Sequence, residues 1–218
     1  MIYELRTYDF APADLAPYLK LFEAEGLPVI SGYADLTGYW IADTGAMPRT
    51  VHLWAYESLE HRAQQRRALY DDARWVKDFL PRALPLIRRQ HSQLLNPLSI
   101  SVDSKALAEK KTAGHALFEL RRYGVKFGQM TAVQQALHAS GASLLKHLNM
   151  VGYWQAITGN LSELTHLWMY RDAPARELQQ AALAADAGFR NEFLADVAPH
   201  FDSMSTEFFR PADFSPLR

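Results

Sequence analysis

Two short stretches of the chain carry a histidine, a tryptophan and a tyrosine at alternate positions. The first is VHLWAY, from Val51 to Tyr56, and the second is THLWMY, from Thr165 to Tyr170. Histidine has an unperturbed pKa of about 6.5, which suits proton transfer near neutral pH, and aromatic rings offer flat surfaces on which a planar ligand can stack. The pattern predicts a small-molecule site built from both stretches.

A glutamate and an arginine alternate in the same way within YELRTY, which begins at Tyr3, and within FELRRY, which begins at Phe118. Arginine can clamp an anionic or carbonyl group through paired hydrogen bonds, and glutamate can act as an acid or a base. Alternate residues of a strand share one face. We therefore expect the polar and aromatic set to face the interior of a barrel, and Tyr3, Leu5, Thr7, Val51, Leu53 and Ala55 to face helices.

We expect the side chains on this interior face to form the functional site. In this site the histidine acts as proton shuttle, the glutamate as second carboxylate and the arginine as oxyanion clamp. The predicted catalytic residues are His52, His166, Glu4, Glu119, Arg6 and Arg121. Aromatic side chains on or beside the same strands are expected to form the ligand-binding walls. They are Tyr8, Tyr39, Trp40, Trp54, Tyr56, Tyr123, Tyr153, Trp154, Trp168 and Tyr170.

Each of these residues also has a purely structural interpretation. The glutamate and arginine can form an interior ion pair that fixes strand register, and the histidines can be core residues with hydrogen bonds across the sheet. The tryptophan and tyrosine rings can simply pack. The sequence leaves both interpretations open.

The two stretches belong to an internal duplication. GYW at Gly38 recurs at Gly152 and HLWAY at His52 recurs as HLWMY at His166, both at an offset of 114 residues. A constant register over many positions predicts two tandem units, at residues 1–98 and 115–218. Residues 99–114 are small, polar and charged, and are expected to form a linker.

The periodicity of each copy predicts the order β-α-β-β-α-β, a ferredoxin-like unit. In the first copy we expect strands near 3–8, 38–42, 51–56 and 89–95, with helices near 15–22 and 58–80. The run EHRAQQRRALYDDAR within the second helical region is expected to be a solvated charged face. One face of each four-stranded sheet remains to be buried, and two such units can cover each other.

The chain resembles the NIPSNAP family, a branch of the dimeric α/β-barrel superfamily, in the motifs YELRTY, GYW, VHLWAY, FLP and LPLIRRQ. The resemblance covers nearly the whole chain, as two consecutive units. It implies an α+β fold in which two tandem ferredoxin-like units pair their sheets into a barrel of the dimeric α/β type with a central cavity.

Composition narrows the possible partners and location. The chain has 218 residues, with 23 Lys plus Arg against 24 Asp plus Glu, so no global positive charge exists to attract nucleic acid. We expect no membrane span, since no apolar run is long enough. The lack of cysteine excludes disulfides and thiolate metal sites and fits a cytoplasmic protein. No chelating histidine motif is present, and we expect no metal.

The resemblance implies two classes of function. Related barrels include cofactor-free monooxygenases, lactone isomerases and haem-dependent enzymes, which implies acid-base or oxidative chemistry on a planar, aromatic or carbonyl ligand. We expect no cofactor, with haem as the exception that the resemblance allows. The alternative is a non-catalytic ligand-binding or protein-interaction module. We also expect a homo-oligomer, and, if the copies have diverged, the active site in the first.

Overall fold

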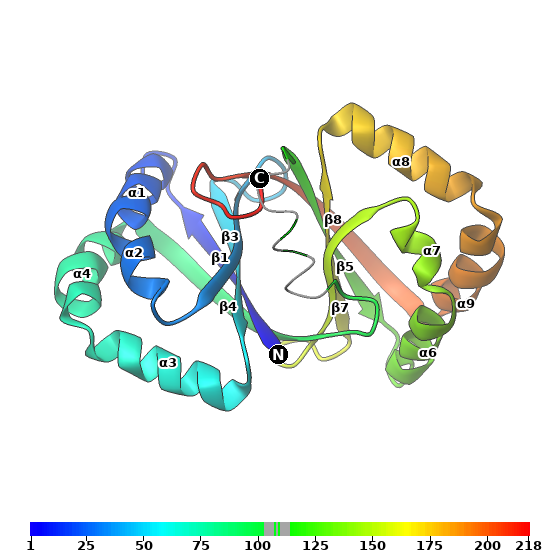
Figure 1. Ribbon diagram of the computed structural model, residues 1–218, viewed down its shortest axis with the longest axis horizontal. Helices are drawn as coiled ribbons and strands as arrows, with labels where there is room; N and C mark the ends of the chain where they lie inside the picture. The colour runs from blue at the N-terminus through cyan, green and yellow to red at the C-terminus, as the bar shows by residue number, and fades with distance from the viewer. Residues whose placement is uncertain (103–106, 108, 110–113) are drawn as a thin grey trace.

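The computed structural model describes residues 1–102, 107, 109 and 114–218, and it contains two units whose sheets face each other. Figure 1 shows the strands in the middle of the molecule and the helices of each unit on the two outer sides. Part of the predicted 99–114 linker lies outside the described residues. This arrangement confirms the predicted fold class.

The first unit has the predicted order of elements, joined in its helical regions by short turns of π and 3-10 geometry. Ser58 caps the long helix, because its hydroxyl accepts a hydrogen bond from the backbone N–H of His61. The elements are β1 (Ile2–Phe10), α1 (Leu15–Leu21), α2 (Leu27–Ile30), β2 (Asp35–Ala42), β3 (Arg49–Tyr56), α3 (Leu59–Asp71), α4 (Leu80–Ala83) and β4 (Ile87–Pro97).

The second unit repeats this order. Asp172 replaces the serine cap and accepts a hydrogen bond from the backbone N–H of Ala175. The elements are β5 (Leu117–Val125), α6 (Met130–Ser140), α7 (Ala142–Leu145), β6 (Asn149–Ala156), β7 (Glu163–Tyr170), α8 (Ala173–Ala185), α9 (Ala195–Val197) and β8 (Phe201–Pro211). Both long helices therefore begin directly after the strand that carries the histidine.

The eight strands close into one antiparallel barrel in the order β1-β3-β2-β8-β5-β7-β6-β4. Within each unit the two central strands pair along most of their length, with Arg6 opposite His52 and Arg121 opposite His166. The units meet at two shorter seams, β2 with β8 and β4 with β6. Closure leaves no free edge among these eight strands.

The barrel interior is filled by apolar side chains of both units, and this corrects the predicted facing. Large members of this cluster, such as Leu5, Leu53, Leu120 and Leu167, are almost completely buried. An eight-stranded barrel is just wide enough for its inward side chains to fill it. The expectation of a central cavity lined by histidine was therefore wrong, and the smooth apolar set belongs inside.

The repeated GYW motif has a packing explanation inside the barrel. A Cβ atom on Gly38 would lie 2.1 Å from Trp40 Cζ2, and one on Gly152 would lie 2.0 Å from Trp154 Cζ2. Each tryptophan therefore covers the glycine two positions before it, on the same face of the strand. The glycine provides the space that lets an indole lie across its own strand.

No helix of the described residues is long and apolar enough to cross a membrane.

We expect Gly152→Ala to lower the free energy of unfolding by about 1–3 kcal/mol, because the added methyl overlaps the Trp154 ring within the packed barrel. Urea unfolding followed by circular dichroism measures the change. The matched control is Gly32→Ala, where the nearest atom to the new Cβ would be 3.4 Å away and the loss should stay below about 0.5 kcal/mol. Equal losses in the two variants would contradict the explanation of the motif.

Candidate functional site

The polar and aromatic face of each central sheet lies against the helices of its own unit. His52, Trp54 and Tyr56 line one pocket between the sheet and the helices of the first unit. His166 and Trp168 line the corresponding pocket of the second unit. The strand alternation thus holds, but the shared face points outward from the barrel and creates two separate pockets in place of one central cavity.

Each histidine is held by the tryptophan two residues further along its strand. The indole Nε1–H of Trp54 donates to His52 Nδ1 at 2.6 Å, and that of Trp168 donates to His166 Nδ1. An indole nitrogen can only donate, so Nδ1 must be unprotonated in both histidines. In the neutral ring the proton then resides on Nε2.

Both histidines are also held neutral by their surroundings. His52 is 2% exposed and His166 is 4% exposed. Burial, and then the positive charge of Arg6, keeps the pKa of His52 well below its usual range, and burial followed by Arg121 does the same to the pKa of His166. Each ring therefore presents an Nε2–H donor at neutral pH.

The Nε2 atoms of these histidines are buried and have no hydrogen-bond partner among the described residues. The His166 ring is stacked between Tyr153, with centroids 4.5 Å apart, and Tyr123, at 5.1 Å. His52 stacks on Tyr39 at 4.6 Å and meets Tyr8 edge-on. A buried donor without a partner is costly, so these two N–H groups are unsatisfied donors at the sheet side of their pockets.

The two glutamates are engaged by arginines from the long helices. Arg62 of α3 forms two hydrogen bonds of 2.8 Å to Glu4, and Arg176 of α8 binds Glu119 in the same bidentate way at 2.8 and 3.0 Å. Burial raises the pKa of Glu4, but the bonds from Arg62, the charge of Arg6 and a bond from Ser92 outweigh it and lower the pKa.

Glu119 behaves in the same way. Burial raises its pKa, but hydrogen bonds from Arg176 and Arg121 outweigh this effect and lower the pKa. Neither glutamate lines its unit's pocket. Both are therefore ionised partners in buried ion pairs, which is the structural interpretation that the sequence left open.

The arginines of the first strands remain at the pockets. Arg121 donates through Nε to Glu119 at 2.7 Å and lines the pocket of the second unit. Arg6 donates through Nη2 to Gln90, lies 3.6 Å from Glu4, and lines the pocket of the first unit. Each pocket thus combines one strand arginine with one histidine N–H.

The pocket of the second unit has a volume of about 340 Å³ and mostly apolar walls from the helices. Leu144, Leu148, Phe189 and Phe193 contribute to these walls, with His166 on the sheet side. This volume falls within the range of about 300–1,000 Å³ that small-molecule sites usually have. The larger cavity therefore lies in the second unit, whereas the sequence favoured the first.

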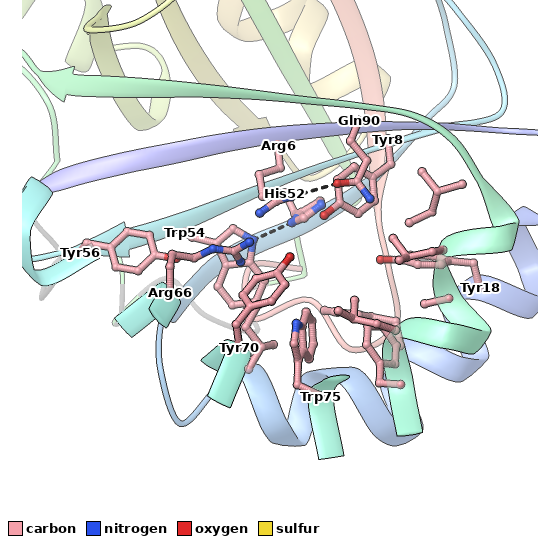
Figure 2. A pocket seen from close by; sticks show the side chains of 17 residues that line it. Arg6, Tyr8, Tyr18, His52, Trp54, Tyr56, Arg66, Tyr70, Trp75 and Gln90 are labelled. Atoms are coloured by element: carbon pink, nitrogen blue, oxygen red, sulfur yellow. Dashed lines mark hydrogen bonds between the residues drawn. The ribbon is translucent and has the colours of Figure 1, made fainter. Parts of the chain in front are cut away.

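The pocket of the first unit has a volume of only about 50 Å³. Figure 2 shows Arg6, His52 and Arg66 around its polar part, with Tyr18, Tyr70 and Trp75 close by. At an offset of 114 residues, Arg66, Tyr70 and Trp75 of this pocket correspond to the smaller Gln180, Ala184 and Phe189 of the second. The two pockets have the same arginine, histidine and tryptophan on the sheet side but differ in volume and in the residues that the helices contribute.

The predicted aromatic walls separate into three groups. Tyr8, Trp54, Tyr56, Tyr123, Tyr153 and Trp168 line the pockets. Tyr39 and Tyr170 do not line either of these pockets: the Tyr39 ring stacks on His52, and the Tyr170 hydroxyl donates a hydrogen bond to Glu119. Trp40 and Trp154 lie in the barrel interior, on the opposite face from the histidines. Their assignment to the same wall was wrong, because they occupy the alternate positions of their strands.

The prediction missed the helix side of the site. Arg62, Arg66 and Tyr70 recur every four residues along α3, which places them on one face of the helix. Arg62 binds Glu4, and the other two line the first pocket. Their spacing was the available signal, and the prediction that this run is simply solvated was wrong for this face.

Haem does not fit the histidines of either pocket. A histidine that binds haem iron through Nε2 needs its proton on Nδ1, where it usually donates to a neighbouring group. Here the indole N–H of Trp54 or Trp168 occupies Nδ1, so Nε2 carries the proton and has no lone pair for iron. Within the part of the chain that the structure describes, no cluster of three or more His, Asp or Glu side chains is placed to hold a metal ion.

The neutral state of the two histidines predicts a pH-dependent stability. Their folded pKa values lie below the unfolded value of 6.5, so stability is full above pH 6.5 and is lost as the pH falls from there toward the folded values. Between pH 6.5 and 5, each should contribute a loss of up to about 1.4 kcal/mol per pH unit. The double variant His52→Gln/His166→Gln should lose less stability over this interval in urea unfolding experiments.

The matched control is His91→Gln/His138→Gln, since both of these side chains are exposed in the folded protein. It should follow the wild-type pH dependence. A double variant at positions 52 and 166 with the same slope as wild type would show that the buried rings titrate normally.

Comparison with known proteins agrees with this architecture. The family model described as NIPSNAP matches residues 3–102 and 118–216. Human "Protein NipSnap homolog 3A" is 29% identical over 181 residues, which cover 81% of this chain and 70% of that protein.

Two solved structures share the fold across both units. A protein from Lactobacillus acidophilus, provisionally described as a monooxygenase, has a TM-score of 0.68 and 13% identity, and covers 95% of this chain and 92% of its own. An anthrone oxidase-like protein has a TM-score of 0.58 and 12% identity, and covers 97% and 91%. At these identities the likeness concerns the fold. The two family-model matches span most of the sequence, and the chain belongs to the NIPSNAP family.

Proposed function

We propose that the second unit binds a small, planar and largely apolar molecule that presents a hydrogen-bond-accepting oxygen. Two observations carry this proposal: His166 lines a cavity of about 340 Å³, and its buried Nε2–H lacks a partner among the described residues. A carbonyl, enolate or phenolate oxygen would satisfy this donor.

The walls of the cavity support a planar, apolar ligand. Leucine and phenylalanine side chains from the helices form one side, and Trp168 with Tyr123 forms part of the sheet side. Arg121 adds one positive charge near the histidine. Arg121, His166 and Gln180 are the main polar residues among predominantly aliphatic and aromatic walls, and so few polar groups favour a ligand with a single oxygen function over a highly polar one.

The chemistry that this arrangement supports is stabilisation of an oxygen anion. A neutral imidazole with its proton fixed on Nε2 can donate to a developing enolate, and a nearby guanidinium lowers the energy of the negative charge. Enolate formation is shared by isomerisation and by cofactor-free oxygenation of planar ketones and phenols. The monooxygenase and oxidase descriptions of the two fold neighbours fit this class.

The glutamates are not part of this proposal as general bases, because Arg62 and Arg176 hold both carboxylates. The non-catalytic alternative is that the pocket only binds its ligand. The cytoplasmic location and the homo-oligomeric state stay predictions.

The first test is binding. We expect 2-naphthol to bind more tightly than 2-methylnaphthalene, and His166→Phe to reduce this preference by about tenfold, because the hydroxyl oxygen loses its N–H donor. Fluorescence titration measures both affinities. Ala184→Tyr, which introduces the residue found at Tyr70 in the first unit, should fill the cavity and abolish binding of both compounds. Tight binding that survives Ala184→Tyr would place the ligand elsewhere.

The second test separates an enzyme from a binding module. Exchange of the α-protons of 2-tetralone with D₂O, followed by NMR, reports enolate formation, in which the proton leaves carbon for solvent and a deuteron returns. We expect the wild-type protein to accelerate exchange and His166→Phe to slow it roughly 100-fold. Binding without acceleration would favour the non-catalytic alternative, and Arg171→Gln, an exposed substitution, is the control for general protein effects.

A further inference from the structure

The first unit differs from the second at three pocket positions on and after its long helix. At the offset of 114 residues, Arg66 corresponds to Gln180, Tyr70 to Ala184 and Trp75 to Phe189. Each change gives the first unit a larger side chain or an added N–H or charge. The histidine, its tryptophan and the strand arginine are the same in both units. The first pocket is therefore a polar, cationic variant of the second.

The charge of the first pocket is positive and uncompensated within its walls. Arg6 and Arg66 both line it, and none of the described lining residues is an aspartate or a glutamate. The nearest carboxylate, Glu4, already forms its bidentate pair with Arg62. Arg6 and Arg66 thus contribute two positive charges that this carboxylate does not balance in full.

Three donors in this pocket are buried and have no partner among the described residues. They are His52 Nε2, Trp75 Nε1 and Arg6 Nε. His52 and Trp75 are 2% and 6% exposed, so water reaches them poorly. Figure 2 shows the Arg6, His52 and Arg66 side chains converging beside the hydrogen bond between Trp54 and His52. Donors and positive charge gathered around one small space form a site for an anion.

The size of the space selects among anions. About 50 Å³ is of the order of one or two water molecules, at about 30 Å³ each. We propose that the first unit binds a small oxyanion of carboxylate size, held by Arg6, Arg66 and the N–H groups of His52 and Trp75. This site is independent of the ligand proposed for the second unit, because it lies in a different pocket with different walls.

The test is titration of the full chain with sodium formate, with sodium chloride as the reference salt. Calorimetry measures affinity, and two-dimensional NMR follows the indole N–H signals of the five tryptophans. Formate should shift the Trp75 signal, which Trp75→Phe identifies by its loss, and should leave Trp168 unchanged. Arg66→Gln, the residue that the second unit carries, should weaken formate binding by at least about tenfold.

The matched control is Arg67→Gln, an exposed arginine on the same helix, which should change the affinity by less than about twofold. Inorganic phosphate is a second probe, and its binding with the same Arg66 dependence would extend the site to tetrahedral oxyanions. Absence of a formate response in the wild type, or equal losses in the Arg66 and Arg67 variants, would overturn the proposal. Ala184→Tyr should leave formate binding intact, which separates this result from the test of the second pocket.

Discussion

Burial of the two apolar sheet faces against each other is the constraint on which the rest of the structure depends. Each four-stranded sheet has one face covered by its own helices, and the other would expose leucine and tryptophan side chains to water. When the two units close the barrel, both of these apolar faces are buried against each other and leave contact with water. The interior is then filled, and the two histidine-lined pockets lie between the sheets and the helices.

This division explains why two strands carry such different residues at alternate positions. Val51 and Leu53 belong to the packed core inside the barrel, whereas His52 and Trp54 line a pocket between the sheet and the helices of their own unit. The indole-to-imidazole hydrogen bond fixes the proton on Nε2, and burial keeps the ring neutral. The same strand thereby stabilises the barrel with one face and carries a buried hydrogen-bond donor on the other.

Much of the architecture could be predicted because it depends on short-range patterns in the sequence. The constant offset between the copies and the alternation within VHLWAY and YELRTY led to the correct fold class, with tandem ferredoxin-like units and a closed barrel. Alternation identifies which residues share a face, but not toward which layer that face points. That choice depends on the width of the barrel, which the sequence of a single strand does not contain.

The candidate site was half predictable for a similar reason. Strand residues such as Arg6 and His52 follow from alternation, whereas the helix residues that complete the pocket depend on how the helix lies over the sheet. Arg62 lies in a charged run that also contains exposed arginines such as Arg67, and the sequence alone does not distinguish the two. The tautomer of His52 required the position of Trp54, because a two-residue spacing alone does not establish a hydrogen bond.

The covalent link between the two units has a consequence for how such pockets can evolve. In a barrel made from two identical chains, every substitution appears twice, so an improved pocket and an altered one cannot exist in the same molecule. In this chain one copy can change while the other is kept, as Tyr70 and Ala184 illustrate. The barrel also forms within one molecule, so its closure does not depend on protein concentration. Duplication within one gene thus permits division of labour between the two halves.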